Sequence, residues 1–304
     1  MAMEPAFSAD DLVIDTHVHI MTDKRIQGLA RWMKKAFPQH PVSETVTPSD
    51  LVDDLKKGGI THFFNLVYPL SVEETDSLND FNVSFCREVP GAIPFAGIHQ
   101  DTPDKAAYAE KCLFRDNMAG FKLHPFVQMF DPWDRRMDDL YGFLQEAGKP
   151  VFFHTGFEAF YGQSMAVSEL KNLLKRFPRL PVVFVHMAFP ELEQVFNLMD
   201  EFPELYLDAT GVFVFFRHSF KPYLDKVLTG SFEQILEKNL ETYKHRIFFG
   251  SDHPVGWGDI VKVFKDLNYI PASDETKRYL KSKAAMAFID RFYPGFDWSR
   301  RLDM

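Results

Sequence analysis

The sequence predicts an α/β fold, a closed (β/α)8 TIM barrel that spans residues 1–304 as a single domain. Short apolar runs alternate with longer amphipathic segments in eight strand-then-helix units, which is the pattern of this barrel. An open, doubly wound sheet would be favoured by a glycine-rich phosphate-binding turn after the first strand, and the sequence has none there. Neither a low-complexity linker nor an internal repeat divides the chain.

Each predicted strand is a near-continuous run rich in Val, Ile and Phe, as expected where both faces of a parallel strand are covered. We expect the strands at residues 13–20, 62–67, 94–98, 120–124, 151–154, 182–186, 205–207 and 247–250. Amphipathic segments predict helices at residues 48–57, 72–88, 104–115, 134–146, 164–176, 190–201, 222–243, 258–266 and 273–292. In the first of these, Thr47 is the expected N-cap before Pro48, and Gly58 and Gly59 end the helix.

Three connections that follow a strand are unusually long, at residues 21–46, 156–163 and 209–221. All three would lie at the mouth of the barrel, the end where the strands finish and where active sites are built. The mouth is therefore the place to search for functional residues.

The composition excludes several classes of function. The 34 basic and 43 acidic side chains give a formal charge of −9, without the basic stripe that a nucleic-acid surface needs. No apolar stretch approaches the roughly 20 residues of a membrane helix, and residues 1–10 do not resemble a signal peptide. Only two cysteines occur, which fits a reducing compartment. We therefore expect a cytoplasmic protein that binds a small-molecule substrate, with neither nucleic acid nor a membrane as a partner.

The positions of the histidines indicate a function. Of the 11 histidines, five lie at or just past the end of a predicted strand: His19, His99, His124, His154 and His186. His17 precedes His19 by two residues, and alternation along a strand places both side chains on one face, together with Asp15. Asp252 follows the last predicted strand.

A single histidine at the end of a strand is more often a hydrogen-bonded structural residue than a metal ligand. We interpret four histidines in that way: His62, His99, His245 and His253. His40 and His218 lie in loops, where simple exposure is the alternative to a role at the site. Coincidence is a poor explanation for the remaining set, because all its members fall at the same ends of their strands: His17, His19, His154, His186 and Asp252. This set predicts a metal site.

Five motifs occur in the order of a known family. They are Val-Ile-Asp-Thr-His-Val-His at residues 13–19, Gly-Phe-Lys-Leu-His-Pro at 120–125, Phe-His-Thr-Gly at 153–156, Val-His at 185–186 and Gly-Ser-Asp-His-Pro at 250–254. Together they resemble the amidohydrolase superfamily, and most closely the family 2 branch that holds aminocarboxymuconate-semialdehyde decarboxylase and many metal-dependent hydrolases. The resemblance implies that a divalent metal ion is bound by four residues: His17, His19, His154 and Asp252. It also implies that His186 lies beside the water or substrate on that ion.

Three imidazoles and one carboxylate suit a single Zn²⁺ ion, with Mn²⁺, Fe²⁺ or Co²⁺ less favoured. Such an ion can lower the pKa of bound water to about 7. We expect two catalytic residues here: Asp252 ligates the ion and takes the proton of that water, and His186 polarises the substrate or carries a proton. Asp15 is either a partner of a ligand or a buried cap of a neighbouring backbone.

Lys122 shares a face with His124 at the end of the fourth predicted strand, and a lysine inside a barrel must be paired or chemically altered. Binuclear members of the superfamily carry a carbamylated lysine on this strand that bridges two metal ions, so a second ion is an open alternative. The Lys-Leu-His-Pro form resembles the branch with one metal ion, which we favour. Lys122 would then be an ammonium that orients an anionic group of the substrate, a third catalytic residue.

The mouth also offers side chains for substrate binding. Trp32, Tyr161 and Arg217, with His124, are placed to frame an aromatic or carboxylated molecule, and Arg217 is the favoured partner for a carboxylate. The alternative is that the aromatic residues only pack their own loops.

The resemblance implies two reactions. The favoured one is hydrolysis of a small ester, lactone or amide, by attack of hydroxide bound to the metal ion. The alternative is non-oxidative decarboxylation of an unsaturated or aromatic carboxylic acid. A barrel without catalysis that serves as a binding protein is a third hypothesis, which the presence of all four ligands weakens. Barrels of this branch are often dimers, so a homodimer is an open expectation.

Overall fold

The computed structural model describes residues 12–157, 161–163, 165–216, 231–256 and 260–302. Across these residues eight parallel strands form one sheet in sequence order. They are β1 (Ile14–Val18), β2 (His62–Leu66), β3 (Ala92–Gly97), β4 (Phe121–Leu123), β5 (Val151–His154), β6 (Val182–Val185), β7 (Leu205–Asp208) and β8 (Ile247–Phe248). Each overlaps a strand expected from the sequence, and the predicted TIM barrel is confirmed.

The sheet closes between its first and last strands. Val18 of β1 forms a parallel bridge with His253, a few residues beyond β8. The His19 N–H donates to the His253 carbonyl at 2.8 Å, and the Thr16 N–H to the Phe249 carbonyl at 3.4 Å. The segment after β8 is therefore held directly against β1.

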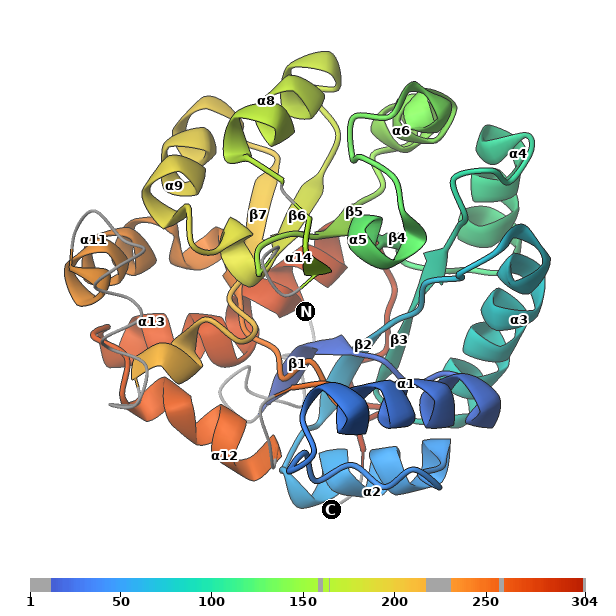
Figure 1. Ribbon diagram of the computed structural model, residues 1–304. Coiled ribbons are helices and arrows are strands. Elements are labelled where there is room, and N and C mark those ends of the chain that lie inside the picture. Colours follow the sequence, from blue (N-terminus) through green and yellow to red (C-terminus); the bar gives the residue numbers. More distant parts are fainter. Residues whose placement is uncertain (1–11, 158–160, 164, 217–230, 257–259, 303–304) are drawn as a thin grey trace, which may run out of the picture.

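Most of the helices form a ring outside the sheet, and others lie over its two ends (Figure 1). They are α1 (Asp23–Ala36), α2 (Pro48–Lys57), α3 (Val72–Glu88), α4 (Lys105–Glu110), α5 (Pro125–Gln128), α6 (Asp138–Ala147), α8 (Val167–Arg176), α9 (Leu192–Glu201), α11 (Phe232–Tyr243), α12 (Ile260–Lys265), α13 (Asp274–Arg278) and α14 (Ala284–Phe292). None of these described helices has the length and apolar character needed to cross a membrane.

α2 forms as its sequence predicts. The Thr47 hydroxyl accepts a hydrogen bond from the Asp50 N–H at 3.2 Å, and the Asp50 carboxylate accepts one from the Thr47 N–H at 2.9 Å. This reciprocal pair satisfies two backbone donors that a helix start otherwise leaves unpaired. The helix ends at Gly58, and Gly59 has a φ of +73°, a conformation that favours glycine.

The connection at residues 21–46 differs from the expectation, because it contains the helix α1. Ile26, Ala30 and Met33 are its buried residues, a spacing of four and three that places them on one face. The amphipathic pattern was present in the sequence, but charged residues surround it and it was interpreted as a loop. Helix α1 therefore contributes ordered structure to the mouth.

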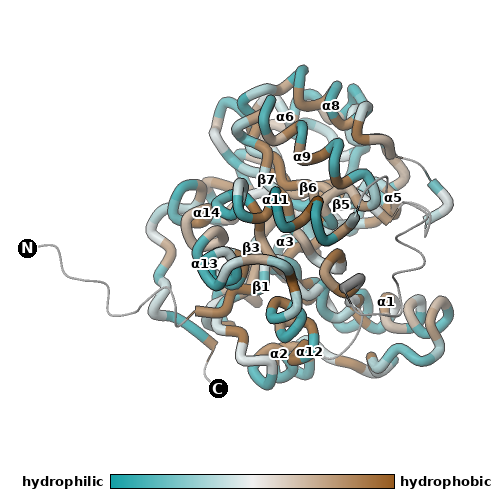
Figure 2. The backbone as a smooth tube through the Cα atoms, turned by 90° about the vertical axis from the view of Figure 1, so that its left-hand side faces the viewer, coloured by the Kyte–Doolittle hydropathy of each residue, from teal (hydrophilic) through white to brown (hydrophobic). Residues whose placement is uncertain are grey.

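Aromatic side chains fill the barrel at the end opposite the mouth. Phe64, Phe152, Tyr206 and Phe248 belong to one buried cluster with Phe288 of α14. The Phe288 ring centroid lies 5.0 Å from that of Tyr206 and 5.0 Å from that of Phe248. Figure 2 shows that hydrophobic residues follow the strands, whereas the surrounding helices change between hydrophilic and hydrophobic residues along their length. The end opposite the mouth is therefore closed by aromatic packing.

Candidate metal centre

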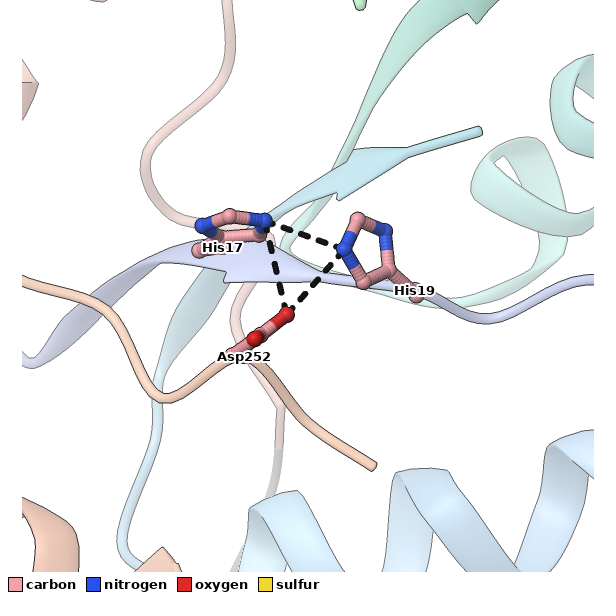
Figure 3. A group of neighbouring side chains, drawn as sticks. All are labelled: His17, His19 and Asp252. Atoms are coloured by element: carbon pink, nitrogen blue, oxygen red, sulfur yellow. Dashed lines mark hydrogen bonds and ion pairs between the residues drawn. The ribbon is translucent and has the colours of Figure 1, made fainter. Parts of the chain in front are cut away.

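Two imidazoles and one carboxylate meet at the mouth of the barrel (Figure 3). The Nε2 atoms of His17 and His19 lie 3.0 Å apart. Oδ1 of Asp252 lies 3.5 Å from Nε2 of His17 and 3.2 Å from Nε2 of His19. One ligand atom from each residue lies within 4.8 Å of the others, an arrangement that could hold one metal ion. The fold thus brings together three of the four ligands that the sequence predicts.

β1 is irregular at the point that carries the two histidines. Its register against β2 shifts between Asp15 and Val18. The Thr16 hydroxyl and Nδ1 of His17 each lie 3.4 Å from Oδ2 of Asp208 on β7, although successive residues of a regular strand point to opposite faces. β1 therefore departs from regular alternation here, although His17 and His19 converge on one side as expected, with their Nε2 atoms 3.0 Å apart.

Asp15 joins β1 to the segment that carries Asp252. Its carboxylate accepts hydrogen bonds from the His17 N–H at 3.1 Å, the Ser251 N–H at 2.9 Å and the Ser251 hydroxyl at 2.5 Å. Of the two roles left open, these contacts are those of a buried backbone cap, and burial raises the pKa of Asp15 to about 7. At Gly250 an added Cβ would lie 2.7 Å from Cβ of His17, so the two segments pack in direct contact.

Backbone carbonyls orient two of the imidazoles. Nδ1 of His19 lies 2.6 Å from the Leu66 carbonyl oxygen, and Nδ1 of His186 lies 2.7 Å from the Thr210 carbonyl oxygen. A carbonyl only accepts, so each Nδ1 carries the proton and each Nε2 keeps a lone pair. Burial lowers the pKa of His186 to about 4 and that of His17 well below its usual range. Neutral imidazole is the form of histidine that binds metal ions.

His154 and His124 lie beside the three-residue group but outside it. Their rings stack with centroids 3.8 Å apart, and the ring of His154 meets that of His186 edge-on at 4.5 Å. Both side chains are buried, yet neither ring nitrogen of His154 nor Nδ1 of His124 has a hydrogen-bond partner among the described residues. Buried polar atoms are normally satisfied, so these nitrogens are available to bind an ion or a substrate. The role of His154 as a fourth metal ligand stays a prediction.

Lys122 is fully buried beside the same group. Its Nζ lies 3.4 Å from Nε2 of His17. Burial lowers the pKa of Lys122 to about 8, against the opposing effect of the Asp252 and Asp208 carboxylates. Burial would raise the pKa of Asp252, but its close contact with His19 and nearby positive charges outweigh burial and lower that pKa. At neutral pH the site therefore holds an ammonium and an ionised carboxylate.

Asp208 is a residue of this site that the sequence analysis missed. It is fully buried at the end of β7, with Oδ2 3.4 Å from Nδ1 of His17. Its position at the end of a strand was the available signal, the same one that identified the histidines. One carboxylate at the end of a strand does not indicate which residues of the other strands it contacts.

The donor set fits a divalent cation. The lone pair of His19 Nε2, the Nε2 atom of His17 and the ionised Oδ1 of Asp252 face one another at 3.0 to 3.5 Å. Electron-rich atoms this close repel one another unless positive charge lies among them. Nitrogen donors with one carboxylate suit Zn²⁺, and Mn²⁺ accepts the same set less readily.

A cavity of about 360 Å³ opens over this group and reaches His186, His154 and Asp252. Its walls are mainly apolar, and the aromatic members of its lining are Phe37, Phe157, Tyr161, Phe213 and Phe249. The site therefore combines a polar, charged floor with a mostly apolar space above it.

The four predicted substrate-binding residues fall in different places. Tyr161 lines the cavity, and His124 is buried with its ring 5.5 Å from that of Tyr161. Trp32 is 41% exposed on α1 and is not among the described residues that line the cavity, whereas Met33 and Phe37 are. Arg217 lies outside the described residues. The role of Trp32 in substrate binding therefore stays a prediction.

Known structures share this fold at low sequence identity. An uncharacterised TIM-barrel protein from Bordetella bronchiseptica is 16% identical, with a TM-score of 0.69 over 92% of this chain and 98% of that one. A 5-carboxyvanillate decarboxylase from Novosphingobium aromaticivorans, complexed with manganese and 4-hydroxy-3-methoxy-5-nitrobenzoic acid, is 14% identical, with a TM-score of 0.63 over 95% and 99%. A 2,6-dihydroxybenzoate decarboxylase from Rhizobium is 14% identical, with a TM-score of 0.61 over 92% and 98%.

No curated protein matches the chain. The family model described as amidohydrolase matches residues 14–290, a range that runs from β1 into α14 and includes every residue of the site described above. This chain therefore belongs to the amidohydrolase family, in the family 2 branch that its motifs resemble.

Proposed function

We propose that this protein is a metal-dependent decarboxylase that releases CO₂ from an aromatic or unsaturated carboxylic acid carrying a hydroxyl group. The observation that carries the proposal is the cavity, where aromatic and aliphatic walls stand over a floor of His186, His154 and Asp252. Such walls suit a planar, apolar ring system. Its carboxylate would be held by the positive charge of Lys122 and of a bound metal ion. Two of the structural neighbours are decarboxylases of hydroxylated aromatic acids, which supports the choice of reaction.

The metal centre of the proposal has His17, His19 and Asp252 as ligands, with His154 as the fourth. A divalent ion, Zn²⁺ or Mn²⁺, would supply positive charge that binds the substrate and stabilises the negative charge of the transition state. The manganese of the 5-carboxyvanillate decarboxylase structure favours testing both ions. Lys122, 3.4 Å from His17, would add positive charge on the same side and favour an anionic substrate.

The pKa shifts indicate how the proton moves. Asp252 is ionised and His186 is a neutral imidazole at neutral pH, so both begin as proton acceptors. One of them takes the proton of the substrate hydroxyl and delivers it to the carbon that bears the carboxylate. The carbon–carbon bond then breaks, CO₂ leaves, and the electron pair of that bond returns the negative charge to the substrate oxygen. Water supplies the proton that completes the product.

Hydrolysis of a small ester, lactone or amide is the second candidate. It is favoured by the ionised Asp252 carboxylate, which lies within 3.5 Å of both histidines and would take a proton from an attacking water. The apolar cavity accepts an aromatic ester or lactone as readily as an acid.

The test begins with metal analysis of protein purified without added metal and of protein dialysed against Zn²⁺ or Mn²⁺. The loaded protein is then assayed with hydroxybenzoates and unsaturated hydroxy acids for CO₂ release, and with aromatic esters and lactones for acid release. Asp252→Asn protein, loaded in the same way, is the control. CO₂ release that depends on the metal and on Asp252 supports the proposal, whereas acid release alone supports hydrolysis. Protein that binds neither ion and forms no product overturns both.

A further inference from the structure

The end of β7 contacts two imidazoles of the site, although β7 contributes no residue to the three-residue metal group. Oδ2 of Asp208 lies 3.4 Å from Nδ1 of His17. Two residues later, the Thr210 carbonyl oxygen lies 2.7 Å from Nδ1 of His186. In both cases the contact is made by the nitrogen that faces away from the metal group.

The surroundings of His17 determine which of its nitrogens carries the proton. Nζ of Lys122 lies 3.4 Å from Nε2, and an ammonium can only donate a hydrogen bond. Nε2 must therefore hold the lone pair, which places the proton on Nδ1. The Asp208 carboxylate faces that proton, with Oδ2 3.4 Å from Nδ1, and Nδ1 has no hydrogen-bond partner among the described residues. The negative charge at this distance favours the proton on Nδ1 by electrostatic attraction.

Asp208 is itself held in place. One carboxylate oxygen accepts hydrogen bonds from the Thr210 N–H at 2.8 Å and from the Thr210 hydroxyl. The other accepts one from the Thr16 hydroxyl at 3.4 Å. The Thr210 hydroxyl also packs closely against Gly250, where an added Cβ would lie 2.7 Å from the hydroxyl oxygen. A fully buried carboxylate fixed in this way can turn little without losing these contacts.

We infer that Asp208 and Thr210 are positioning residues, which set the tautomer and the ring orientation of His17 and His186 so that each Nε2 is directed into the site. This inference deepens the proposed function, because it concerns the same metal centre. The physical basis is general: an acceptor that binds the distal N–H of a ligand histidine fixes its ring and raises the affinity of the metal site. Here one short segment does this for a ligand and for the neighbouring catalytic histidine.

The first test uses the metal-free protein, labelled with ¹⁵N on the histidine rings. NMR correlation of ring nitrogens with ring protons reports which nitrogen is protonated. The wild-type spectrum should show His17, His19 and His186 as Nδ1–H tautomers. In Asp208→Asn we expect the His17 signals to shift or to show a mixture of tautomers. The His19 signals should stay unchanged, because their partner is the backbone carbonyl of Leu66.

The second test measures metal affinity by competition with a chelator, using Zn²⁺ and Mn²⁺ as the probes. We expect Asp208→Asn to bind about 10- to 100-fold more weakly than the wild type. Thr210→Val should weaken binding in the same direction, and Thr210→Ser, which keeps the hydroxyl, should restore it. Asn79→Ala is the matched control, because Asn79 is also buried and hydrogen-bonded to a strand backbone but contacts Gly97 and Tyr108 rather than a histidine.

The outcomes separate this inference from the proposed function. Unchanged His17 signals and unchanged metal affinity in Asp208→Asn overturn the inference while leaving the metal centre in place. An equal loss of affinity in Asn79→Ala also overturns it, because general destabilisation would then explain the effect. A wild-type protein with the expected tautomers that binds no metal contradicts the proposed function, and the positioning of the two rings still stands.

Discussion

The two ends of the barrel bury polar groups in different ways. At the mouth, His17, His154 and His186 are buried within reach of the charge of Lys122. At the opposite end, where the strands begin, His62 is buried beside the aromatic rings of Phe296 and Trp298. The same residue type is thus part of the packing at one end and part of a polar cluster at the other.

This difference indicates where stability and function reside. Aromatic rings pack closely around Phe288, so that end contributes burial of apolar surface. The mouth instead confines a lysine, carboxylates and imidazoles, an arrangement that is unfavourable without a bound cation or substrate. Substitutions at the mouth should therefore change chemistry more than stability, and substitutions at the opposite end the reverse.

The largest effect is expected for Asp252→Asn. The substitution removes the charge that faces His17 and His19 and the group proposed to carry the proton. We expect kcat/KM to fall by about 10²- to 10⁴-fold on the substrate found by the assays above. Asp297→Asn, an exposed carboxylate at the other end of the barrel, is the control and should retain full activity. A variant of Asp252 that keeps most of its activity would contradict the proton-transfer role.

The opposite result is expected for Phe288→Ala. The ring packs against Phe64, Phe152, Tyr206 and Phe248, and its removal leaves a cavity in the apolar end. We expect the free energy of unfolding to fall by about 3 to 5 kcal/mol, measured by denaturant titration. Metal affinity of the folded fraction should not change. A loss of metal affinity similar to that of Asp208→Asn would show that the two ends are coupled.

Acid should destabilise the protein partly through His62. Burial lowers its pKa in the folded protein to about 4, from a usual value near 6.5. Between these values the unfolded chain binds more protons, so stability is present above pH 6.5 and falls as the pH drops toward 4. Between pH 7 and pH 5, we expect the free energy of unfolding of His62→Gln to fall by about 2 kcal/mol less than that of the wild type. The free energy of unfolding is measured by urea denaturation at each pH. If it falls equally with pH in both proteins, His62 does not contribute.

The smallest effect is expected for Thr47→Ala, which removes the N-cap of α2 without touching the cavity. The free energy of unfolding should fall by about 1 kcal/mol, and Thr47→Ser should recover most of it. Metal affinity should be the same in all three proteins. A change in metal affinity would mean that α2 influences the site, although it supplies none of the described residues of the metal group.

Much of the architecture follows from local patterns. Runs such as Val182–Val185 are apolar on both faces, and only a buried parallel strand satisfies such a run. Thr47, Pro48 and Gly58 mark the ends of α2 through backbone chemistry that depends on adjacent residues alone. The sequence also predicts that three histidines lie at the ends of strands, His19, His154 and His186, because strand ends are local features.

Local patterns in the chain specify which kind of residue each strand brings to the mouth. How these residues meet depends on contacts between distant segments. The register shift in β1 departs from regular alternation. The closure of β1 on the segment after β8 and the contact of Asp208 with His17 join residues that are far apart in the chain. Such contacts depend on the stagger and closure of the whole barrel, and no pattern within a single strand encodes them.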